Sequence, residues 1–83
     1  MPEYKRIDDL AELIQVAVRA LRKALADGDE KHPPGSWMGE TYANQINHLQ
    51  KHLGALLNSR EDGEDHLAHI ICRAVIAKAL LER

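Results

Sequence analysis

The chain has 83 residues and a formal net charge of −2, with acidic and basic residues interspersed along its length. Mixed charge disfavours binding to duplex nucleic acid or to an anionic membrane surface. A chain this short fits one domain that buries little surface by itself. Its apolar residues are mostly Leu, Ala and Ile, without any Phe, and such residues favour helices. We therefore expect an all-α domain, residues 1–83, that assembles as a homo-oligomer.

The single cysteine, Cys72, excludes an intramolecular disulfide, and its apolar neighbours predict a buried thiol. Residues 1–8 form a tail without the hydrophobic core of a signal peptide, and no apolar run is long enough to span a bilayer. We expect a cytoplasmic protein without a membrane partner.

The first apolar periodicity predicts a helix over about residues 9–27. Asp9 and Glu12 have the spacing of a capping box, and Gly28 is expected to end the helix in a left-handed conformation. Residues 28–39, with three glycines and two prolines, are expected to form an ordered loop or a lid. The residues expected on the buried face of the helix recur every three or four positions: Leu10, Leu13, Ile14, Ala17, Leu21, Ala24 and Leu25.

Two further helices are predicted over about residues 40–57 and 64–81, and the short turn between them makes them antiparallel neighbours. The buried face of the second helix is predicted to carry Tyr42, Ile46, Leu49, Leu53, Leu56 and Leu57. That of the third is predicted to carry Leu67, Ile70, Ile71, Ala74, Ala77 and Leu81.

Polar side chains border these two apolar faces. His48 and His52 align on the second helix, and His66, His69 and Arg73 align on the third. Imidazoles at such spacing can hold a divalent ion, and the acidic residues Asp62, Glu64 and Asp65 offer an oxygen-rich alternative suited to magnesium. The competing interpretation is that the histidines only form hydrogen bonds at the edge of the helix contact.

Three other side chains allow two interpretations each. Arg73 can hold a phosphate in a bidentate manner or pair with a nearby carboxylate. Trp37 can stack on a base or pack the loop onto the helices. Lys31 can contact a phosphate or remain solvated.

The loop GDEKHPPGSW, the KHL element and the final DHLAHIICRAVIAKAL together resemble the small phage and bacterial domain of dATP/dGTP diphosphohydrolases. That family is related in chemistry to the all-α nucleoside triphosphate pyrophosphohydrolases. The resemblance covers about Gly28 to Leu81. The residues that match the family's motifs are Glu30, Lys31, Trp37, His52, Leu53, His66, Leu67, Ala68 and His69.

The resemblance implies a nucleotide ligand and a metal-dependent attack of water between the α- and β-phosphates. It implies a divalent ion, Mg²⁺ or Mn²⁺ rather than Zn²⁺, held by Asp62, Asp65, His52, His66 and His69. It assigns catalysis to Asp65 and His69, and contacts with substrate to Lys31, Lys51, Arg73 and Trp37.

Two other functions remain open at this stage. The chain can be a non-catalytic module, such as a phage sponge that sequesters a nucleotide second messenger, or a structural helical interaction protein. A nucleotide-binding assay separates the three functions. Cleaved nucleotide indicates the enzyme, intact bound nucleotide indicates the sequestering module, and no binding indicates the interaction protein.

Overall fold

The computed structural model describes residues 7, 9–33, 35–59 and 62–83, and within these ranges the side chain of Trp37 is left out. The expected tail, residues 1–8, lies almost wholly outside the described residues. The described residues form three α-helices and one short 3₁₀ helix, without a β-strand, which confirms the all-α class. Within this part of the chain, no helix combines the length and apolar character needed to cross a bilayer.

Helix α1 spans Leu10–Lys31 and begins as expected. The Asp9 side chain accepts a hydrogen bond from the Ala11 amide at 2.9 Å, which satisfies a free donor of the first turn. The predicted end at Gly28 is wrong, because the helix continues to Lys31. His32 precedes Pro33 and has extended φ and ψ values of −137° and 164°. The proline therefore ends α1 by excluding helical geometry from the residue before it.

The connection to the next helix contains the 3₁₀ helix η1, Ser36–Gly39. Helix α2 spans Tyr42–Leu57 and is capped by the Thr41 hydroxyl, which accepts from the Asn44 amide. Helix α3 spans His66–Leu81 and is capped by Asp65, whose carboxylate accepts from the Ala68 amide at 3.0 Å. In the turn between them Gly63 has a φ of +78°, a conformation that glycine adopts without strain.

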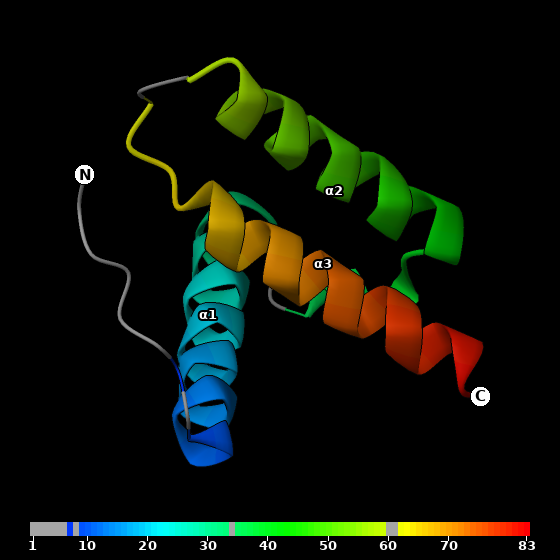
Figure 1. The fold of residues 1–83 in the computed structure, drawn as a ribbon. Coiled ribbons are helices and arrows are strands. Elements are labelled where there is room, and N and C mark those ends of the chain that lie inside the picture. The colour runs from blue at the N-terminus through cyan, green and yellow to red at the C-terminus, as the bar shows by residue number, and fades with distance from the viewer. Residues whose placement is uncertain (1–6, 8, 34, 60–61) are drawn as a thin grey trace.

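Figure 1 shows α2 and α3 as an antiparallel hairpin, as expected from the short turn. Helix α1 packs against α3, which crosses in front of it, and the N-terminal half of α1 extends away from the hairpin. The side of the hairpin turned toward the viewer is therefore not covered by α1.

Small residues make up the buried apolar core among the described residues: Ala24, Ala55, Ala68, Cys72 and Ala77. Cys72 is buried as predicted, and this burial raises the pKa of its thiol. Two polar residues are also buried, Gln45 with 0% and His66 with 6% of its surface exposed. The helices thus meet around polar side chains.

The predicted buried faces of α2 and α3 are wrong in large part. Residues expected inside but exposed are Tyr42, Leu53, Leu56, Leu57, Leu67, Ala74 and Leu81. The helices instead contact each other through the polar stripe with Gln45, His52 and His66, about 100° around each helix from the leucines. On the predicted face of α1, Ala24 is buried whereas Leu10, Leu13 and Ile14 are exposed. These three residues belong to the N-terminal half of the helix, which extends away from the hairpin (Figure 1).

Candidate functional site

Three histidines from α2 and α3 meet at the hairpin end. The Nδ1 atoms of His52 and His66 lie 2.8 Å apart. The ring of His69 stacks on that of His52, with centroids 4.6 Å apart and an interplanar angle of 15°. The histidines predicted at a helix border therefore form one cluster between two helices. Burial lowers the pKa of His52, so its neutral form is favoured.

Asp62 fixes the orientation of His66. Both carboxylate oxygens lie 3.0 Å from His66 Nε2. The backbone amide of Glu64 and the imidazole of His66 hold the pKa of Asp62 below its ordinary value, so the carboxylate only accepts. His66 Nε2 must then carry a proton, and in the neutral ring Nδ1 has a free lone pair. His52 Nδ1–H can donate to that lone pair, or a cation can take the place of its proton.

Glu64 completes a group of three potential ligands. Its carboxylate lies 3.8 Å from His66 Nδ1, and one ligand atom from each of His52, Glu64 and His66 lies within 4.8 Å of the others. Lys31 from α1 forms a hydrogen-bonded ion pair with Glu64, and this pair lowers the pKa of the Glu64 carboxyl. Two imidazole nitrogens and an ionised carboxylate form a donor set that fits a divalent transition metal.

A second carboxylate, Asp27 of α1, orients His69. Its Oδ2 atom lies 3.2 Å from His69 Nε2, and Lys23 donates to Asp27 at 2.8 Å. The hydrogen bonds from Lys23 and His69 lower the pKa of Asp27. His69 Nε2 therefore carries the proton of this contact, which leaves Nδ1 as an acceptor when the ring is neutral.

Arg73 belongs to a polar network in the interior. Its Nη1 atom donates to Glu40 at 2.6 Å and to the side-chain oxygen of the buried Gln45 at 2.9 Å. Gln45 donates in turn to Glu40 at 3.4 Å. The structure thus shows the carboxylate pairing that was one of the two interpretations of Arg73.

A cavity of about 180 Å³ lies beside these groups, between α1, α2 and α3. The polar and titratable side chains in its wall are Asp29, Lys31, His32, Ser36, Glu40, His48, His52, Glu64, His69 and Arg73. Burial, followed by the charge of Arg73, lowers the pKa of His48. The wall of the cavity therefore combines basic side chains with the carboxylates of Asp29, Glu40 and Glu64.

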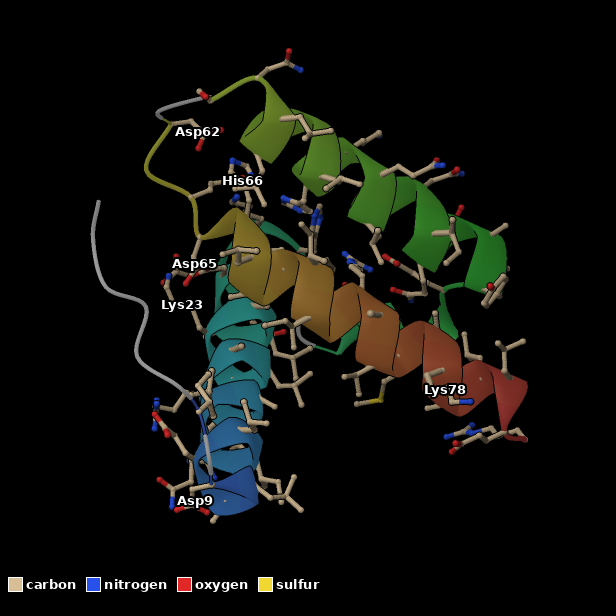
Figure 2. The ribbon with its side chains drawn as sticks, viewed as in Figure 1. Asp9, Lys23, Asp62, Asp65, His66 and Lys78 are labelled. Carbon is tan, nitrogen blue, oxygen red and sulfur yellow. The ribbon has the colours of Figure 1, made fainter. Side chains whose placement is uncertain are left out.

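The predicted site residues separate into groups. His52, His66, His69 and Asp62 come together, and Lys31 reaches the same place from α1. Asp65 instead caps α3, and Figure 2 shows it near Lys23, whereas Asp62 and His66 lie together at the start of α3.

Two other predicted residues lie elsewhere. Lys51 is exposed on α2 and is not among the residues that line the cavity. The side chain of Trp37 lies outside the described part of the chain, so its contact with a base stays a prediction.

Sequence reasoning missed Asp27, Glu40 and Gln45. Asp27 lies 42 positions before His69, and Glu40 lies 33 positions before Arg73, so periodicity within one helix carries no signal for either pair. Of these three residues, only Gln45 could have been found from the sequence. It shares the polar stripe of His48 and His52 on α2.

Comparison with known families matches residues 4–83 to the family described as dATP/dGTP diphosphohydrolase, N-terminal. Neither the curated proteins nor the solved structures gave a match. The family match covers nearly the whole chain and agrees with the resemblance carried by its loop and histidine motifs. The chain belongs to the family of dATP/dGTP diphosphohydrolase N-terminal domains.

Proposed function

We propose that this domain binds the phosphate chain of dATP or dGTP beside the histidine cluster and hydrolyses the bond between the α- and β-phosphates. The observation that carries the proposal is the group of potential metal ligands His52, Glu64 and His66. This group lies next to a cavity whose wall includes Lys31 and His69. The name of the family supports the substrate class.

His52, Glu64 and His66 would hold a divalent ion, with Asp62 presenting the free Nδ1 of His66. Imidazole donors favour Mn²⁺ over Mg²⁺, which prefers oxygen ligands. When bound, the ion would neutralise phosphate charge and lower the pKa of a bound water.

His69 is the proposed general base. Asp27 accepts from Nε2 and leaves Nδ1 free to take a proton from the attacking water. The water oxygen forms a bond to the α-phosphorus, and the bond from that phosphorus to the oxygen bridging to the β-phosphate breaks. The products are a nucleoside monophosphate and pyrophosphate, and the water's proton goes to His69.

The size of the cavity indicates which part of the substrate it holds. Its volume of about 180 Å³ is below the roughly 300–1,000 Å³ of pockets that enclose drug-sized ligands. The phosphates therefore lie inside and the nucleoside extends outward. Lys31 is paired with Glu64, as Arg73 is with Glu40. When Glu64 binds the ion, Lys31 is released to supply a positive charge to the phosphates.

The test incubates the chain with dGTP or dATP and Mn²⁺ and identifies the nucleotide afterwards. We expect monophosphate and pyrophosphate from the unmodified chain, loss of at least about 100-fold in rate with His69→Ala, and an unchanged rate with the exposed Gln50→Ala on α2. Nucleotide that raises the melting temperature but stays intact would favour a sequestering module instead. A melting temperature that does not change with nucleotide would favour an interaction protein.

A further inference from the structure

The hairpin carries an exposed apolar surface, which we call the leucine face. Its members come from α2 and α3: the exposed Leu53, Leu56, Leu67 and Leu81, with the half-buried Leu49 and Ile71 beside them. Leu53 is 43%, Leu67 is 59% and Leu81 is 64% exposed. Large apolar side chains gathered on one surface of a soluble domain mark a contact with another molecule.

The leucines of both helices lie on the same side of the hairpin. On each helix the apolar stripe is displaced from the polar contact stripe by about 100° in the same rotational sense. Because the two helices are antiparallel (Figure 1), equal displacement places both stripes on the same side of the hairpin. Ala68, Cys72 and Ile76 follow the opposite side of α3, and Cys72 and Ile76 line the cavity together with residues of α1. The leucine face is therefore left uncovered by the residues that the structure describes.

The amount of exposed surface matches what a dimer would bury. The chain exposes 6724 Å². A folded monomer of this mass exposes about 5,000 Å² by the usual scaling. If residues 1–6 are counted as fully exposed and set aside on both sides of this comparison, the excess is roughly 800 Å². This is comparable with the roughly 800 Å² that each partner buries in a standard interface.

We propose that the leucine face binds a second copy of this chain about a two-fold axis, so that two hairpins form an antiparallel four-helix bundle. The apolar positions 49, 53 and 56 and the positions 67, 71, 74 and 81 recur at the spacing of three and four that such bundles require. A two-fold axis lets one apolar surface cover an identical one, so no second kind of groove is needed.

The charges around the face are compatible with this partner. Lys78 falls within the α3 stripe, and its ammonium lies 3.9 Å from Glu82 of the same helix. The partner therefore does not have to supply a carboxylate. With a formal net charge of −2 for each chain, long-range repulsion between two copies is small.

The first test measures the mass and melting temperature of the unmodified chain over a range of concentrations. We expect twice the 9.3 kDa of one chain in sedimentation, and a melting temperature that rises with protein concentration. A 9.3 kDa species at every concentration, with a constant melting temperature, overturns the proposal and assigns the face to a different partner.

A second test locates the interface without depending on destabilising variants. In a Cys72→Ser background, Leu67→Cys introduces a thiol within the leucine face. Asn47→Cys introduces one at an exposed position of α2, about 150° around that helix from its leucines. Alkylation at position 67 should slow at least about tenfold as protein concentration rises, whereas the rate at position 47 stays constant. Equal rates at both positions overturn the proposal, as does a dimer that dissociates with Ile14→Gln but persists with Leu67→Gln.

Discussion

At the scale of single residues, two adjacent acidic side chains have different environments. Glu64 lies beside His66 and Lys31, whereas Asp65 accepts from a backbone amide of α3. The family resemblance placed Asp65, and not Glu64, among the metal ligands. Helix capping uses the same carboxylate, and only the folded turn shows which neighbour faces the histidines.

Glu64→Gln should therefore weaken Mn²⁺ binding by more than about tenfold, since an amide is a poorer ligand than a carboxylate. Asp65→Asn should leave binding almost unchanged, because asparagine also caps helices well. Titration calorimetry with Mn²⁺ on both variants measures the difference. If Asp65→Asn had the larger effect, the ligand group would have to include Asp65 in place of Glu64.

The buried network around Arg73 leads to a prediction on stability. Gln45→Ala removes an acceptor of Arg73 and a donor to Glu40 at a position with 0% exposure. We expect the free energy of unfolding to fall by about 1–3 kcal/mol, because the remaining groups lose a buried partner. Urea denaturation measures it, with the exposed Gln50→Ala on the same helix as the control. Equal values for the two variants would contradict the prediction.

At the scale of the helices, the sequence predicted the bounds well except for the end of α1, and it predicted the buried faces less well. Asp9 caps α1 as its spacing predicts, but Gly28 lies inside the helix and Pro33 determines where it stops. Conformational freedom lets glycine end a helix without requiring it to. A proline, by contrast, restricts the residue before it in every context.

Helix α3 offers a direct test of capping. Asp65→Ala should lower the free energy of unfolding by about 1 kcal/mol, since the Ala68 amide loses its acceptor. Asp65→Asn should restore most of that stability. Circular dichroism during urea denaturation gives both values. A loss of the same size in both variants would mean that the charge of Asp65, and not its capping, stabilises α3.

At the scale of the whole molecule, the helices pack opposite to the usual pattern. Sequence patterning assumes that the apolar stripe faces the chain's own core. Here Gln45, His52 and His66 occupy the contact between α2 and α3, and the leucines lie outside. The pattern was correct about which residues share a face. Which face the rest of the chain covers is decided by tertiary packing.

This polar interior makes the folded state sensitive to acid. Burial lowers the pKa of His48 and of His52 below the ordinary value of 6.5, so the unfolded chain takes up these protons first as pH falls. Their contribution to stability is complete above pH 6.5 and is lost as pH falls through that value toward the folded pKa. The pKa values of three carboxyl groups are also lowered, so their contribution to stability is lost at more acidic pH. These groups are Asp27, Asp62 and Glu64.

We therefore expect the unmodified chain, without metal, to lose more stability between about pH 7.5 and pH 5.5 than a His48→Gln, His52→Gln double variant does. The free energy of unfolding at several pH values, measured with a chelator present, tests the difference. The glutamines cannot titrate, so they remove the histidine contribution while keeping polar side chains in the contact. Parallel pH profiles for the two proteins would show that protonation of these rings does not oppose folding, and that the interior between α2 and α3 admits the charged form.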